Sequence, residues 1–291
     1  MNEQGKKKIR SLNKGKGIDG PVSQTCVYVI MAIVVFLVLL PVLLTLMLSF
    51  KSNYDLLQGI WSIPSQIMWS NWQFGFTEIL PNMLNSIVIA FVSTFFTVFI
   101  GAISAYVFVR MDFLGKNVLF KLVILLMLIP SIITLTPLYI LCVDLNIENT
   151  WFAIWFPTVA GGQVSAIFLF STFFRQQPKD IFEAAKIDGA GELKMFFSIC
   201  LPLAVPVLCI QAVNSFAAGY NDFLWPTIII QETSKQPLMP VLKNLTTVAE
   251  SNGQQGVSYA MYLLSGIPLV FTTLFGLKYF VNGDFASGLK L

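Results

Sequence analysis

Histidine is absent from the 291 residues of this chain, and charged residues make up only 11% of it. Without histidine, the chain lacks the usual residue of zinc hydrolases, of serine-type catalytic triads and of histidine proton relays. The sequence also contains no G-x-x-x-x-G-K-[ST] stretch, the loop that cradles nucleotide phosphates. These absences argue against a hydrolase and against nucleotide binding by this chain.

Cysteine is scarce as well, with four in the whole sequence. Cys26, Cys142, Cys200 and Cys209 all fall in apolar stretches and show no paired metal-ligand spacing, so we interpret them as small hydrophobic residues. No metal site and no cofactor are predicted. The net charge of +3 is too small to indicate binding to nucleic acid.

Apolar residues are abundant, at 56% of the chain, and they gather in long runs without any charge. A helix needs about 20 apolar residues to cross a bilayer. The charge-free runs that reach this length are 20–50, 79–109, 122–143, 149–174, 195–221 and 251–277. The sequence therefore predicts an all-α membrane protein with six transmembrane helices.

The first run follows a basic tail, as the core of a secretory signal would. Its apolar stretch is longer than the roughly 7 to 15 residues of such a core, and no small-residue cleavage site follows, so we expect an uncleaved anchor. We divide the chain into a cytoplasmic tail, 1–25, and a six-span transmembrane domain, 26–291. The lysines of the tail could bind anionic lipid or could serve only to orient the chain.

Positive charge is distributed unevenly among the predicted loops. With the N-terminus inside, 15 of the 18 Lys and Arg residues lie in cytoplasmic segments. Because Lys and Arg mark cytoplasmic loops, both termini are predicted to be inside. The external loops are then 51–78, 144–148 and 222–250. The first is rich in tryptophan and phenylalanine, and it either lies on the membrane surface or docks an external partner.

The cytoplasmic loop 175–194 contains strong helix signals. Pro178 and Asp180 suit the start of a helix, and Gly189 can adopt the left-handed conformation that ends one. Ile181 and Phe182 give this short helix an apolar face. That face could enter a groove of a partner protein or could lie on lipid headgroups.

The stretch EAAKIDGAGELKMFFSICLPLAVP resembles the signature loop of the permeases of ATP-binding-cassette importers. The matching positions are Glu183, Ala184, Ala185, Gly189, Ile199, Leu201 and Pro202. Further strings extend the resemblance along nearly the whole chain, to the maltose-permease G-like subunits of the carbohydrate branch. They are LPVLLTLMLSFK, NSIVIAFVST, AYVFVR, IPSIITLTPLYIL, YNDFLWP and KYFVNGDFASGLK.

The resemblance implies a type I importer permease fold with a cytoplasmic coupling helix between the fourth and fifth spans. It also implies a second, related permease, two copies of an ATPase that binds ATP and Mg²⁺, an external solute-binding protein and a sugar as substrate. The residues expected to contact the ATPase are Ile181, Phe182, Glu183, Ala184, Ala185, Asp188 and Gly189. A second contact is expected in the C-terminal tail, at Gly283, Gly288 and Lys290, although Asp284 and Phe285 depart from the family's tail.

Polar residues in the fifth predicted span suggest a substrate pathway. Gln211, Asn214, Ser215, Ala218 and Asn221 recur at helical spacing and so share one face. Amides suit the hydroxyls of a sugar, and Gln163 in the fourth span is a similar candidate. The alternative is that these side chains form ordinary hydrogen bonds between helices.

The favoured function is thus a multi-pass transport subunit in a bacterial plasma membrane that catalyses no reaction itself. A secondary transporter would be expected to carry ionisable residues inside its spans, and the six runs contain none. An intramembrane enzyme would have to rely on serine or threonine alone. A membrane scaffold that docks the ATPase without transporting anything is the remaining alternative.

Overall fold

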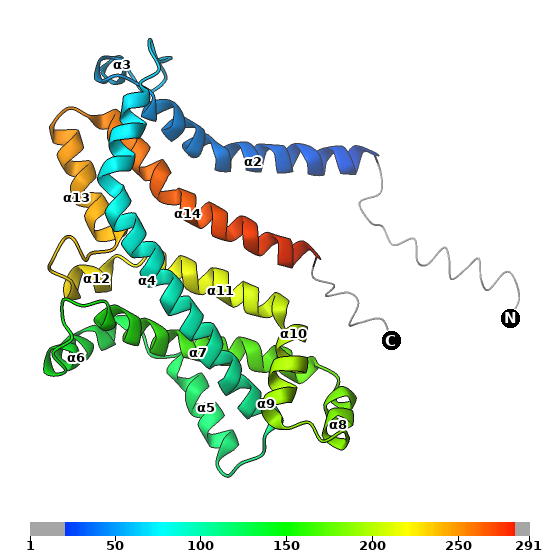
Figure 1. Cartoon of the computed structure of the whole chain (residues 1–291). Coiled ribbons are helices and arrows are strands. Elements are labelled where there is room, and N and C mark those ends of the chain that lie inside the picture. Colours follow the sequence, from blue (N-terminus) through cyan, green and yellow to red (C-terminus); the bar gives the residue numbers. More distant parts are fainter. Residues whose placement is uncertain (1–20, 283–291) are drawn as a thin grey trace, which may run out of the picture.

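The computed structural model describes residues 21–282, and every regular element in that range is helical. The helices, shown in Figure 1, are α2 (Pro21–Ser49), α3 (Asn53–Leu57), α4 (Trp69–Arg110), α5 (Lys116–Leu126), α6 (Ser131–Asp144), α7 (Phe152–Gln176), α8 (Lys179–Ile187), α9 (Glu192–Met195), the π-helix η1 (Phe196–Cys200), α10 (Leu201–Leu203), α11 (Val205–Tyr220), α12 (Leu224–Ile229), α13 (Leu238–Ser251) and α14 (Gln255–Asn282). The predicted tail contacts at Gly283, Gly288 and Lys290 lie outside the described residues, as does most of the 1–25 tail.

Four helices in the described range, α2, α4, α7 and α14, are long and apolar enough to cross a membrane unbroken. The count reaches the predicted six when two bent pairs are each taken as one span. The pair α5 and α6 bends by 101°, and the segment Glu192–Leu203 bends by 78° from α11. The third and fifth spans are therefore both sharply bent.

Proline explains where both spans break. Pro130 precedes α6 in an extended conformation, and a residue before proline is itself pushed away from helical geometry. In the fifth span the break at Ala204 lies between Pro202 and Pro206, and the short helix α10 separates it from the π-helix. Prolines and π-bulges are the common causes of sharp kinks.

Helices α4 and α7 form the centre of the bundle and approach each other closely. A Cβ added at Gly101 would lie 2.6 Å from the Cβ of Ala166, and one at Gly162 would lie 2.8 Å from Cγ2 of Thr97. Small residues allow this close contact, as is typical of membrane helices. α7 continues without a break through Gly161 and Gly162.

The predicted external loops 51–78 and 222–250 both contain helical structure. α4 begins at Trp69, so 69–78 are helical, and 222–250 contains α12 and α13. Asn82 of α4 donates to the carbonyl oxygens of Thr233 and Gln236, both at 2.9 Å, and Ser86 Oγ accepts from the backbone of Leu238 at 2.7 Å. These bonds hold the outer segment against α4.

Helix α2 contacts α14 near its Ser49 end and projects away from the rest of the bundle (Figure 1). The most apolar window of α2 is wholly exposed in the isolated chain. In a membrane, lipid or another membrane chain has to cover this surface. The Pro21 end of α2, the Asn282 end of α14 and α8 lie on one side of Figure 1, opposite α12 and α13, as the predicted topology requires.

Candidate functional site

Helix α8 follows α7 directly and presents the resembling Glu-Ala-Ala stretch. Pro178 precedes it, Asp180 lies in its first turn and Lys186 in its last, so both charges suit the helix dipole. The helix ends at Asp188, and Gly189 follows with φ of +77°. This left-handed conformation favours glycine, as the sequence predicted.

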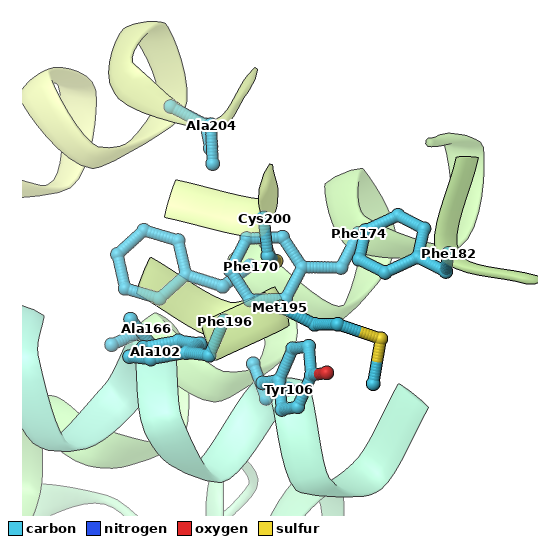
Figure 2. Close-up of a cluster of buried hydrophobic side chains, with 12 residues drawn as sticks. Ala102, Tyr106, Ala166, Phe170, Phe174, Phe182, Met195, Phe196, Cys200 and Ala204 are labelled. Atoms are coloured by element: carbon cyan, nitrogen blue, oxygen red, sulfur yellow. The ribbon is translucent and has the colours of Figure 1, made fainter. Parts of the chain in front are cut away.

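The two apolar residues predicted to face a partner point in different directions. Ile181 is 44% exposed, whereas Phe182 is only 6% exposed and packs into its own chain. Figure 2 shows the Phe182 side chain pointing inward, toward Phe174 of α7. The expectation that Phe182 docks into a partner is therefore corrected. Its burial instead attaches α8 to the bundle, contributing about 1.5 to 3 kcal/mol.

Arg110, the last residue of α4, connects three elements at this point. Its guanidinium carbon lies 3.8 Å from the centre of the Phe182 ring. Its Nη2 atom donates to the carbonyl oxygens of Phe174 at 3.0 Å and of Gln177 at 3.1 Å. Because helix ends leave carbonyls without partners, Arg110 caps α7 while it stacks on α8.

Glu192, at the start of α9, forms a second connection between this loop and α4. It accepts a hydrogen bond from the hydroxyl of Tyr106 on α4 at 2.8 Å. Its other carboxylate oxygen lies 3.1 Å from Nζ of Lys186 on α8. The coupling loop is therefore attached to α4 both through Arg110 and through Tyr106.

The connection continues into the bent fifth span. The buried Gln177 side chain donates to the carbonyl oxygen of Cys200, the last residue of η1, at 3.1 Å. Met195, Phe196 and Cys200 lie in the same buried cluster as Phe182 (Figure 2). A displacement of α8 would thus act on both α7 and the π-helix.

The outward side of α8 carries most of the predicted contact residues. Glu183, Ala184, Asp188 and Gly189 are exposed, while Ala185 is partly buried against the cluster. We call the exposed set the coupling surface: Ile181, Glu183, Ala184, Ile187, Asp188 and Gly189.

Sequence reasoning missed several residues of this region. Ile187, 87% exposed, extends the apolar side of the coupling surface, and its spacing from Ile181 and Ala184 could have indicated this. Tyr106 and Arg110 lie in the string AYVFVR, which marked the resemblance but was given no role. Their link to the loop is long-range and carries no local signal.

The predicted pathway face on α11 divides into a buried and an exposed part. Gln211 is buried, and its Nε2 atom donates to Ser215 Oγ at 3.0 Å within the same helix. Asn214, Ala218 and Asn221 are exposed. The amides of Asn214 and Asn221 are thus exposed at the surface of the isolated chain, whereas the amide of Gln211 is buried.

Gln163 lies between α4 and α7. Its Nε2 atom donates to the carbonyl oxygens of Val159 at 3.2 Å and of Thr97 at 3.4 Å. The Oε1 atom is buried without a hydrogen-bond partner. Gln163 thus forms a hydrogen bond between α7 and α4, which is the alternative that the sequence left open for this residue.

Within residues 21–282, no three His, Cys, Asp or Glu side chains gather as a metal site.

Residues 97–282 match the family described as "Binding-protein-dependent transport system inner membrane component". The chain belongs to this family. It is therefore a multi-pass inner-membrane permease, and it is a transport component with no enzymatic role of its own. The matched residues include the coupling loop and both bent spans, so the geometry above is that of the family's defining region.

Named relatives of this permease cover most of its length. It is 30% identical to the arabinooligosaccharides transport system permease protein AraQ of Halalkalibacterium halodurans, over 89% of this chain and 94% of that protein. It is 28% identical to the sn-glycerol-3-phosphate transport system permease protein UgpE of Yersinia pestis, over 88% and 94%. It is 32% identical to the osmoprotective compounds uptake permease protein GgtD of Synechocystis, over 71% and 69%.

The fold of the permease matches a chain in the crystal structure of a bacterial ABC transporter involved in the import of the acidic polysaccharide alginate. The TM-score is 0.78 at 20% identity, covering 89% of this chain and 96% of that one. This likeness shows the type I importer permease fold. The bends in the third and fifth spans thus belong to a fold seen in a solved transporter.

Proposed function

We propose that this permease forms part of a bacterial importer for a carbohydrate or another polyhydroxylated solute, driven by separate ATPase subunits that dock on the coupling surface. The observation that carries the proposal is the two-sided construction of α8. Its outer side is exposed and carries Ile181 and Ile187, while its inner side is attached to α4 through Arg110 and Phe182. A helix built in this way can receive a partner's movement and pass it on.

ATP and Mg²⁺ belong to the partner in this proposal, because the chain has no phosphate-binding loop of the G-x-x-x-x-G-K-[ST] type. Closure of two ATPase subunits would push on the coupling surface. The force would reach α7 through the Arg110 bonds and η1 through Gln177. The bend between α10 and α11 gives the fifth span a point at which to move.

The substrate class rests on the relatives and on α11. Two of the named relatives transport arabinooligosaccharides and sn-glycerol-3-phosphate, both of which bear hydroxyl groups. The exposed amides of Asn214 and Asn221 could donate to and accept from such hydroxyls. An external solute-binding protein would deliver the solute, and a second, related permease would complete the pathway beside α2 and α11.

Purification of the tagged permease from its native membrane in mild detergent tests the proposal directly. The expected result is co-purification of a second permease and an ATPase, with ATP hydrolysis that rises when the binding protein and its sugar are added. Recovery of the chain alone in several gentle detergents, without ATPase activity, would favour a secondary transporter. Co-purification of an ATPase whose rate of ATP hydrolysis does not change when the binding protein and sugar are added would favour a scaffold.

A further inference from the structure

The segment between α2 and α4, residues 50–68, buries its positive charge. We call this segment the outer loop. Lys51 is only 1% exposed, and its ammonium group donates to the carbonyl oxygens of Gly59 at 3.0 Å and Ile60 at 2.9 Å. A third bond, to Ser62 Oγ at 3.1 Å, uses the last donor of the ammonium. The lysine therefore holds the loop closed from within.

The negative charge of the loop is buried as well. Asp55 is 5% exposed, and its Oδ2 atom accepts hydrogen bonds from Ser52 Oγ at 2.8 Å and Ser65 Oγ at 3.0 Å. These bonds, the one from Ser52 first, hold the pKa of Asp55 below its ordinary value, so the carboxyl stays ionised. Between Lys51 and Glu78 the sequence contains no other charged residue.

The outward side of the loop is consequently neutral, and it is also apolar. Large exposed side chains cover it: Tyr54, Leu57, Ile60, Trp61, Ile63 and Ile67. Ile63 is 85% exposed and Trp61 is 72% exposed. This is the reverse of a soluble loop, in which charged groups face water and apolar groups are covered.

We propose that the outer loop is a lipid anchor, seated at the boundary between headgroups and acyl chains of the outer leaflet. Tryptophan and tyrosine favour that layer, and buried charges remove the cost of bringing the loop into it. In Figure 1 the loop lies at the Ser49 end of α2. The most apolar window of α2 has no buried residues, whereas Leu48, Ser49 and Lys51, at the junction with the loop, are buried in the chain itself. A bilayer that surrounds the exposed part of α2 therefore ends near the loop.

The hydrogen bonds inside the loop make it a preformed anchor. Lys51 fixes the carbonyls of Gly59 and Ile60. Trp61 directly follows them, and Ile63 lies two residues further on. Gly59 has φ of +127°, a backbone conformation that residues other than glycine rarely adopt. The ammonium thus holds the turn that projects the two apolar side chains. An anchor ordered beforehand loses little conformational freedom when it enters the lipid.

The test places a nitroxide probe on the loop in the full-length protein. Ile63→Cys and, as a matched control, Val248→Cys are labelled in proteoliposomes, with the signal of identically treated wild-type protein subtracted. Val248 is 56% exposed on α13, a helix outside the 50–68 loop. Collision rates with oxygen, which dissolves in lipid, and with a water-soluble nickel chelate are then compared.

The expected result is a several-fold excess of oxygen over chelate collisions at position 63, and the opposite at position 248. Equal access of the chelate at both positions would overturn the proposal, because the loop would then lie in water. Protection of position 63 from both reagents would also overturn it, in favour of a protein partner on the loop. Leu57→Cys, on the same side of the loop and 83% exposed, serves as an independent second site.

Discussion

The guanidinium carbon of Arg110 lies 3.8 Å from the centre of the Phe182 ring, so the end of the second span rests on the inner side of the coupling helix. The same guanidinium caps α7 through the carbonyls of Phe174 and Gln177. One side chain thus connects α4, α7 and α8. Its loss should separate movement of α8 from movement of the bundle.

Arg110→Gln is expected to lower uptake strongly and to reduce thermal stability in detergent. The substitution removes hydrogen bonds from a charged donor, worth about 1.5 to 3 kcal/mol each before screening by solvent, and leaves the Phe182 ring without its cation. Arg175→Gln is the matched control, since Arg175 is exposed and lies 5.1 Å from the Phe120 ring. Equal loss of uptake in both variants would contradict a specific role for Arg110.

Tyr106→Phe tests the second connection of the coupling loop. It keeps the ring but removes the hydroxyl that donates to Glu192 at 2.8 Å, at a cost of about 0.5 to 1.5 kcal/mol. We expect ATP hydrolysis by the reconstituted complex to become less dependent on external ligand. Tyr262→Phe removes a similar bond, to Thr246 at 3.2 Å, on the outer side, and should leave this dependence unchanged. A ligand response that both variants retain in full would argue against the Tyr106 link.

Gly189→Arg should abolish transport while the protein still inserts into the membrane. Nothing lies within 4 Å of a Cβ built at Gly189, so a side chain there starts in open space, where the partner is proposed to dock. Backbone strain at φ of +77° adds roughly 1 to 2 kcal/mol. Gly115→Arg is the control, because Gly115 has φ of +82°, is equally open and lies on another cytoplasmic loop. Normal uptake by a well-expressed Gly189→Arg protein would refute docking at this turn.

The sequence predicted the spans, the sidedness and α8 because each has a local signal. Charge-free length indicates a span, and the Asp188–Gly189 stop indicates a helix end. The direction of Phe182 could not be predicted in this way, because its burial depends on Arg110, which is far away in the sequence. The same holds for the outer segment 222–250, which the charge-free runs place between two spans. Its helices α12 and α13 have no such local signal, and the turn between them accepts hydrogen bonds from Asn82 of α4.

Because α4 and α7 are in close contact, we expect alanine substitutions at the neighbouring Gly161 and Gly162 to affect the stability of the protein very differently. Gly162→Ala would bring a Cβ to 2.8 Å from Cγ2 of Thr97, whereas Gly161→Ala would meet nothing within 4 Å. Overpacking of this kind costs about 1 to 3 kcal/mol, so the first variant should unfold at lower temperature in detergent. The second should match wild type or exceed it slightly, because alanine favours the helix. Similar melting temperatures for both variants would show that α4 and α7 can separate freely.

Asn214→Leu examines whether the exposed side of α11 faces the solute. Asn214 is exposed in the isolated chain, and leucine keeps its approximate size while removing the amide that could bind a hydroxyl. If α11 lines the pathway, the concentration for half-maximal uptake or the maximal rate should change several-fold, with the amount of assembled complex unchanged. Thr272→Val is the control, because the Thr272 hydroxyl donates to Pro268 of its own helix at 2.8 Å. An uptake curve that Asn214→Leu leaves unaltered would contradict a role for this amide in the pathway and would favour the alternative, in which polar side chains of this helix form ordinary hydrogen bonds between helices and do not select the solute.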